Sequence, residues 1–311
     1  MSTDQQTTVA VVAPRFPPDV GGLENYAHWV ARSLQSEGYR VVVVSTHPGR
    51  GITEDEVDGL PVIRLGAPLT LSNTPINPWW YVQLRRIFRE HHVDVVNTHA
   101  PVPFLADVAT YAAGRRPVVA TYHAGSMVKG VGGPIDGLLR GYERWVLPRV
   151  LRRATRLVGV SPIALTTRTG RDVTISPGVD TSVFHPPPDD AVRDPHVLYA
   201  GRIETASRWK GLQVLVASWP AVLEQRPDAV LEVVGDGDLV PEIKALADDL
   251  GVADSIRWHG SLSHGQLAEV MRRVSVIPND SDSVRDGRHV TLTRRITSAS
   301  SPWLRLPCQR M

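Results

Sequence analysis

Apolar runs of strand length alternate with helix-length segments through the first 160 residues. Residues 23–37 place apolar side chains at spacings of three and four, which predicts an amphipathic helix. Because the runs lack the polar alternation of a half-exposed sheet, they predict a parallel sheet covered by helices on both faces. The expected strands cover residues 8–13, 40–45, 93–97, 117–122 and 156–160.

This pattern stops after Phe184 and resumes near residue 197. The intervening stretch holds three consecutive prolines and two aspartates, which continue neither a helix nor a central strand. We therefore predict a first domain over residues 1–185, an extended linker over 186–195 and a second α/β domain over 196–283. The second domain has expected strands at 197–200, 230–234, 255–259 and 274–277, and expected helices at 211–224, 238–250 and 264–273.

The last 28 residues, 284–311, show neither the apolar spacing of a helix nor an apolar run of strand length. They hold six arginines, one acidic residue and scattered serines and threonines. Such a composition predicts a disordered basic tail that is not part of the fold. Because the change after a strand and loop is abrupt, a reading-frame change in the coding sequence is an alternative origin.

Composition and charge narrow the function classes. Basic and acidic residues number 34 and 32, a balance that argues against a nucleic-acid partner. The single cysteine, Cys308, forms no intramolecular disulfide, and the polar N-terminus lacks the apolar core of a signal peptide. No apolar run approaches the roughly 20 residues that span a bilayer. A cytoplasmic protein is expected.

Candidate site residues in the first half follow its predicted strands. Gly21 and Gly22 end a loop and open a helix, where exposed backbone N–H groups suit an anion such as a phosphate, although a simple tight turn is equally compatible. His99 and His123 each follow an expected strand, at the sheet edge where such folds bind ligands. A structural role for either histidine stays open, and their spacing matches no zinc pattern, so no metal is expected.

The second half offers a cationic pair. Arg202 follows a strand and Lys210 precedes the next helix, so the two could clamp a diphosphate or be ordinary surface charges. Gly235 lies in a turn at a strand end, and we interpret it as structural. A run of arginines could be a solvated helix face or could contact a membrane surface. These arginines are Arg140, Arg144, Arg149, Arg152, Arg153 and Arg156.

Several segments together resemble one enzyme family. They are PRFPPDVGGLENYAHWVARSL, NTHAPVPFLADVA, TYHAG, SPGVDTSVFHP, YAGRIETASRWKGLQVL, VVGDGDLVPEIKALADDLGV and WHGSLSHGQLAEVMRRVSVIPNDSD. In this order they are similar to the retaining GT-B glycosyltransferases of family 4, from about Val9 to Ser283. The resemblance implies two Rossmann-like domains, a nucleotide-sugar donor, a glycan or lipid-linked acceptor and transfer with retained configuration. Peripheral contact with the inner membrane surface is a further expectation beside the cytoplasmic location.

The resemblance also implies roles for individual residues. Gly22 corresponds to a loop glycine at the donor phosphate, and His123 to a histidine beside the transferred sugar. Arg202 and Lys210 correspond to the pair that neutralises the diphosphate without a metal or other cofactor. Gly235 and Gly260 would lie near the nucleotide base and ribose.

The chain departs from the family pattern after Ser283. The family continues there into a glutamate-containing loop and helix, whereas Val284, Arg285 and Asp286 follow here. We therefore expect a second domain that is incomplete and transferase activity that is impaired. The alternative is a catalytically inactive, truncated binding remnant. A dehydrogenase is disfavoured, since no G-x-G-x-x-G fingerprint occurs.

Overall fold

The computed structural model describes residues 6–19, 21–71, 74–128, 134–188 and 194–276. The chain divides into two compact units, Met1–Gly178 and Val179–Met311. The predicted tail and Cys308 lie outside the described residues, and so does the middle of the predicted linker. The expected incompleteness of the second domain also concerns residues outside the described ones.

The first unit is built on a sheet of eight strands in the order β10-β9-β8-β7-β1-β2-β4-β3. All neighbours are parallel except β3, which pairs antiparallel with β4. The strands are β1 (Thr8–Val12), β2 (Arg40–His47), β3 (Ile52–Val57), β4 (Leu60–Gly66), β7 (Val95–Ala100), β8 (Val118–Tyr122), β9 (Arg156–Gly159) and β10 (Asp172–Thr174). The sheet was predicted to be parallel, and only its β3 edge departs from this.

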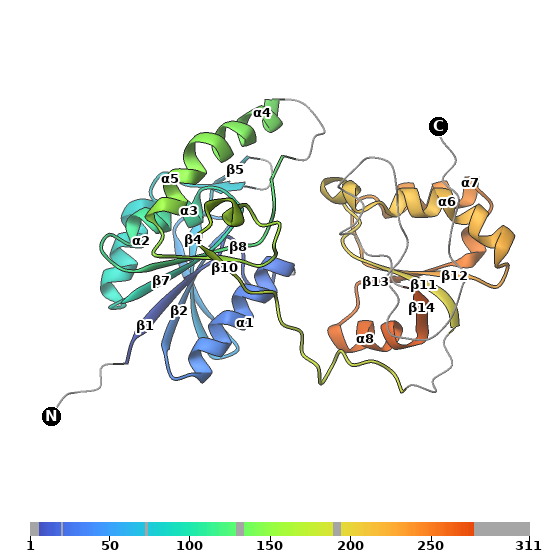
Figure 1. The fold of residues 1–311 in the computed structure, drawn as a ribbon, viewed down its shortest axis with the longest axis horizontal. Coiled ribbons are helices and arrows are strands. Elements are labelled where there is room, and N and C mark those ends of the chain that lie inside the picture. Colours follow the sequence, from blue (N-terminus) through green and yellow to red (C-terminus); the bar gives the residue numbers. More distant parts are fainter. Residues whose placement is uncertain (1–5, 20, 72–73, 129–133, 189–193, 277–311) are drawn as a thin grey trace. The chain divides into compact units, whose positions relative to one another are not determined.

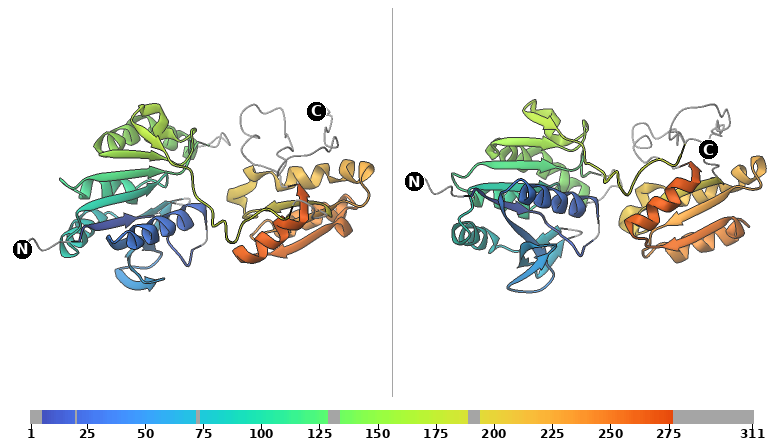
Figure 2. Two further views of the ribbon diagram at one scale, coloured as in Figure 1. Left: turned by 60° about the horizontal axis from the view of Figure 1, so that its bottom comes forward. Right: turned by 90° about the horizontal axis from the view of Figure 1, so that it is seen from below.

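Helices cover both faces of this sheet, as Figures 1 and 2 show. Along β1, Val9 and Val11 pack on one side, in the cluster that includes the buried face of α1 (Gly22–Ser36). Ala10 and Val12 point to the other side, where α2 (Trp80–Glu90), α3 (Leu105–Ala112) and α5 (Leu147–Arg153) contribute the core. Because both faces are covered, β1 is apolar at every position after Thr8.

The remaining elements of this unit lie around the sheet. A short antiparallel pair joins β5 (Leu69–Leu71) and β6 (Thr74–Ile76). The helix α4 (Pro134–Gly141) continues through a π-helical turn, Tyr142–Val146, into α5. A 3-10 turn, Leu165–Thr169, precedes β10. The sequence analysis predicted neither the β3–β4 hairpin nor the β5–β6 pair. β3 is polar and exposed, and β5 and β6 have three residues each, whereas β4 is an apolar, buried strand that was missed.

The second unit contains a parallel sheet of four described strands in the order β13-β12-β11-β14. Figure 1 shows α6 and α7 on one face of this sheet and α8 on the other. Its strands are β11 (Asp194–Ala200), β12 (Val230–Val234), β13 (Ile256–Gly260) and β14 (Val274–Val276), and its helices are α6 (Leu212–Gln225), α7 (Val240–Asp249) and α8 (His264–Arg273), with 3-10 turns at Thr205–Lys210 and Ala253–Ser255.

The core of the second unit is larger on the face of α6 and α7. Leu231 and Val233 of β12 pack there against Val216 and Trp219 of α6. On the opposite face, Val234 belongs to a smaller cluster beneath α8. Asp194 and Pro195 lie in β11, although we expected both in the linker, because β11 pairs with β14 from residue 194 onward.

Candidate functional site

His123 and His99 meet at the carboxyl edge of the first sheet. The distance between His123 Nε2 and His99 Nδ1 is 3.0 Å, and the His123 backbone N–H donates to the carbonyl of Ala100. His123 follows β8 as predicted and is partly buried. His99 was predicted to follow its strand, and this was wrong: it lies inside β7 and is fully buried. The parallel strand continues past residue 97 because its backbone pairs with β8 as far as Ala100.

Two further residues organise this pair, and the sequence pattern did not identify them. Asn97 Oδ1 lies 2.7 Å from His99 Nε2. The ring of Tyr26, one helical turn after Gly22 on α1, packs edge-on against His123 at a centroid distance of 4.9 Å. Asn97 begins a run of three buried polar residues in β7, and that unusual run is the signal that could have drawn attention to it.

Burial keeps both histidines neutral. Loss of solvent lowers the pKa of His123 from 6.5 to about 4. Burial, followed by the nearby His123, holds the pKa of His99 well below its ordinary value. At neutral pH the pair therefore contributes hydrogen-bonding groups to the edge and no charge.

The loop that carries His123 is tied to the π-helical turn. The hydroxyl of Ser126 donates to the carboxylate of Glu143 at 2.9 Å, and the backbone N–H of Met127 donates to the same group at 2.6 Å. Tyr142, next to Glu143, donates its hydroxyl to Asp107 of α3. The bonds of Ser126 and Met127 fix the loop three and four residues after the histidine.

Gly22 is the first residue of α1, as predicted, and it is exposed. Gly21 occupies the N-cap position with an extended backbone, and no side chain caps the helix. A Cβ added at Gly22 would meet no atom of the described residues within 4 Å. Packing therefore does not require glycine here, which leaves the helix terminus accessible to an anion.

Arg202 and Lys210 both lie at the carboxyl edge of the second sheet. Arg202 is the second residue after β11, and Lys210 ends the 3-10 turn that precedes α6. Lys210 Nζ would lie 3.3 Å from a Cβ built on Gly201, so the ammonium group reaches back to the end of β11. Both side chains are partly buried. The predicted placement of two cations at one strand-to-helix crossing is what the structure shows.

The glycines at this edge differ in why they are needed. Gly235 has a φ of 136°, and a Cβ there would lie 1.9 Å from the carbonyl oxygen of Gly201. This close approach of two backbones requires glycine whatever ligand is bound. Gly260 has a φ of 65°, with open space around its missing Cβ. The Gly235 N–H donates to the Gly260 carbonyl at 2.8 Å, so the two loops are joined.

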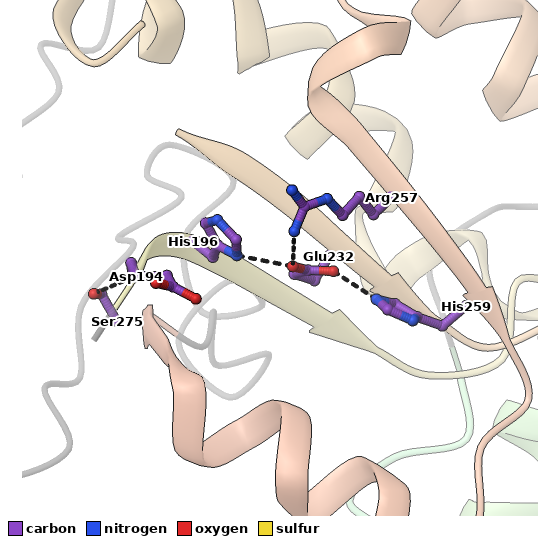
Figure 3. A network of polar contacts seen from close by, with 6 residues as sticks. All are labelled: Asp194, His196, Glu232, Arg257, His259 and Ser275. Carbon is purple, nitrogen blue, oxygen red and sulfur yellow. Dashed lines mark hydrogen bonds and ion pairs between the residues drawn. The ribbon is translucent and has the colours of Figure 1, made fainter. Parts of the chain in front are cut away.

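A buried carboxylate, that of Glu232, lies in the middle of β12 in the second sheet (Figure 3). Glu232 of β12 is 3% exposed and bonds His196 of β11 at 2.8 Å, and His259 and Arg257 of β13 at 2.5 and 3.3 Å. Burial raises the pKa of Glu232, but the hydrogen bonds and charges of His259 and His196 outweigh this, and the pKa lies below its ordinary value. The network joins three adjacent strands.

The arginines of residues 140–156 are all exposed, and apolar side chains accompany them. In α4 and the π-helical turn, Ile135, Leu138, Trp145 and Val146 are between 45% and 61% exposed. The guanidinium of Arg144 lies 5.3 Å from the centre of the Trp145 ring. We call this set of exposed arginines and apolar residues from 135 to 156 the basic apolar surface.

Comparison with known proteins identifies the family. The sequence model of glycosyltransferase family 4 matches residues 20–183, and that of glycosyl transferases group 1 matches residues 194–285. The chain belongs to glycosyltransferase family 4. The family recognised from the sequence motifs is thereby confirmed, whereas the retained configuration stays a prediction.

Curated relatives are also glycosyltransferases by name, and a solved structure shares the fold. Phosphatidyl-myo-inositol mannosyltransferase of Mycolicibacterium smegmatis is 27% identical over 277 residues, covering 86% of this chain and 68% of the relative. GDP-mannose-dependent alpha-(1-6)-phosphatidylinositol monomannoside mannosyltransferase of Mycobacterium tuberculosis is 26% identical, covering 83% and 69%. Sucrose-phosphate synthase of Thermosynechococcus elongatus superposes with a TM-score of 0.62 at 19% identity, covering 88% and 75%. The α/β fold prediction is confirmed.

The described residues contain neither a metal-binding cluster nor a membrane-spanning helix. No group of three His, Cys, Asp or Glu side chains there is placed to hold a metal ion. None of the described helices is long and apolar enough to cross a membrane. That the reaction needs no metal or other cofactor stays a prediction.

Proposed function

We propose that this protein binds a nucleoside-diphosphate sugar and transfers the sugar to an acceptor with retention of configuration. The observation that carries the proposal is the match of both units, in order, to the two glycosyltransferase models. Since curated relatives are named as GDP-mannose-dependent and phosphatidylinositol mannosyltransferases, GDP-mannose is the first donor to test, and a lipid-linked acceptor the first acceptor.

Arg202 and Lys210 have the central role in this proposal. Negative charge develops on the departing diphosphate as the sugar bond breaks, and fixed cations stabilise that charge without a metal. The exposed N-terminus of α1 at Gly22 offers backbone N–H groups to a phosphate. His123 lies beside the transferred sugar, and the joined loops at Gly235 and Gly260 contact the nucleotide.

Calorimetry with GDP-mannose and UDP-glucose tests the donor site. Arg202→Ala and Lys210→Ala should each weaken binding at least tenfold, because a hydrogen bond to a charged group contributes about 1.5–3 kcal/mol. Arg226→Ala is the matched control, since Arg226 follows α6 at the opposite edge of the sheet and pairs with Asp228. Unchanged affinity in both site variants would remove the pair from the donor site.

Transfer by this particular chain is a separate question. Its residues after Ser283 lack the glutamate-containing loop that the family resemblance implies, so we expect donor binding with little or no transfer. A labelled-sugar transfer assay beside the calorimetry distinguishes an active transferase from a catalytically inactive binding remnant. Binding without transfer favours the binding remnant, whereas transfer at an ordinary enzymatic rate would show that the missing loop is dispensable.

The proposal includes contact with an anionic membrane surface. On the basic apolar surface, arginines attract anionic lipid headgroups while exposed side chains such as Trp145 enter the interface. Sedimentation with vesicles of neutral or anionic phospholipid tests this. Binding to anionic vesicles should weaken in Arg144→Gln and in Trp145→Ser, whereas Arg226→Gln should bind as the wild type does. Equal binding to neutral and anionic vesicles would contradict the proposed attraction between the arginines and anionic headgroups.

A further inference from the structure

The hydrogen-bond chain behind His123 determines where its proton lies. It begins at Asn97, whose amide nitrogen lies 3.1 Å from the backbone carbonyl oxygen of Val119. A carbonyl oxygen only accepts, so this contact requires the amide nitrogen of Asn97 on that side. Asn97 Oδ1 is thereby directed at His99 Nε2, 2.7 Å away.

The orientation of Asn97 sets the tautomers of both histidines. Because Asn97 Oδ1 only accepts, His99 Nε2 must carry a hydrogen. Since buried His99 is neutral, its Nδ1 holds a lone pair and accepts the hydrogen of His123 Nε2, 3.0 Å away. His123 Nδ1 is then a bare acceptor. Among the described residues, no hydrogen bond to His123 Nδ1 occurs.

Tyr26 restricts the remaining freedom of the His123 ring. Its ring meets that of His123 at 82° with a centroid distance of 4.9 Å, and meets His99 at 5.9 Å. Turning the His123 ring over would also exchange Nε2 for a carbon in the contact with His99, leaving the buried lone pair of His99 without a donor. That loss costs on the order of 1–3 kcal/mol, so one orientation is favoured.

We propose that Asn97 and His99 are positioning residues that hold His123 as a neutral acceptor for a hydroxyl group of the transferred sugar. This rests on the proposed function, which places His123 beside that sugar. A bare nitrogen attracts an O–H donor and repels a carboxylate, so the geometry favours a neutral sugar over a uronic acid at this position. It also means that His123 does not act as an acid at neutral pH.

The first test needs no ligand and no variant. Nitrogen-15 NMR of the full chain, with labelled histidines, distinguishes a protonated ring nitrogen from a bare one. At neutral pH His123 should show a proton on Nε2 and none on Nδ1. A proton on Nδ1, or a doubly protonated ring, would overturn the proposed arrangement.

The second test uses Asn97→Asp to reverse the direction of the hydrogen bond between His99 and His123. A carboxylate beside His99 Nε2 favours the imidazolium form of His99, whose Nδ1–H then donates to His123 and moves the His123 proton to Nδ1. Asn77→Asp is the matched control. Asn77 is also buried, and its amide nitrogen donates to a backbone carbonyl, that of Gly66, at 2.7 Å. It takes part in no described contact with His99 or His123.

The test is completed by comparing affinities for nucleotide sugars with affinities for the corresponding nucleoside diphosphates. Asn97→Asp should bind GDP-mannose or UDP-glucose up to about tenfold more weakly, because the sugar hydroxyl must turn from donating to His123 Nδ1 to accepting from it, and it should bind GDP and UDP as the wild type does. Asn77→Asp should change neither affinity. An equal loss for sugar-bearing and sugar-free ligands would show a merely structural role and overturn the proposal, as would an inverted tautomer with unchanged sugar affinity. If the wild type binds none of these ligands, the proposed function fails and the sugar-binding role with it, while NMR still decides the proton arrangement.

Discussion

Replacing Gly235 by alanine should damage the second unit through its backbone alone. The added Cβ would lie 1.9 Å from the carbonyl oxygen of Gly201 and 2.9 Å from its carbon, so the two loops must separate by more than 1 Å to reach ordinary contact. The φ of 136° adds strain of about 1–3 kcal/mol for a residue with a side chain.

Separation of the loops also weakens two hydrogen bonds. These are Gly235 N–H to the Gly260 carbonyl, at 2.8 Å, and Gly201 N–H to the Val234 carbonyl, at 3.0 Å, each contributing about 1 kcal/mol. Together with the strain, Gly235→Ala should cost about 3–5 kcal/mol. Gly260→Ala is the control: its φ is 65° in open space, and the cost is about 1–2 kcal/mol.

Hydrogen exchange measured by mass spectrometry on the full chain gives the local free energy of opening. Peptides from β11 and β12 should lose protection strongly in Gly235→Ala and slightly in Gly260→Ala, while peptides from the first unit stay unchanged. Equal losses in the two variants would refute the close-approach reasoning. Gly235 would then be an ordinary turn residue, and any effect of its replacement on nucleotide binding would have to come from the ligand contact.

Three further predictions follow from the sites. Gly22→Ala should leave the stability of the first unit unchanged or raise it by up to about 1 kcal/mol, yet weaken nucleotide-sugar binding; calorimetry beside urea unfolding checks both. Because burial lowers the pKa of His123 to about 4, the first unit should lose stability on the order of 2–3 kcal/mol as the pH falls from 6.5 toward 4, where the buried imidazole must take up a proton. Urea unfolding across this pH range should show a free energy of unfolding that depends less steeply on pH in His123→Gln than in the wild type. Glu232→Gln should destabilise the second unit by about 1–3 kcal/mol above pH 4.5, with the difference disappearing as pH falls through the lowered pKa of Glu232; the exposed Glu224→Gln serves as control, and an equal loss in both would contradict the network.

The sequence by itself determined the two α/β units and the location of most elements. The helix expected at 264–273 is α8, and the strand expected at 230–234 is β12. Helix and strand periods are local properties of a few consecutive residues, so they are visible in one sequence. The same holds for Gly22 at a helix start and for two cations flanking one crossing, whose ligand roles stay predictions.

Only the tertiary structure decided which distant residues meet. His99 and His123 are 24 residues apart, and they touch because β7 and β8 are parallel neighbours in a particular register. Glu232 gains His196 and His259 in the same way, from strands on either side of it. A spacing along the chain gives no strand order and no register, and those two properties set the hydrogen-bond partners, the burial and therefore the protonation of each group. The need for glycine at 235 likewise arises from Gly201, which folding brings within contact of it.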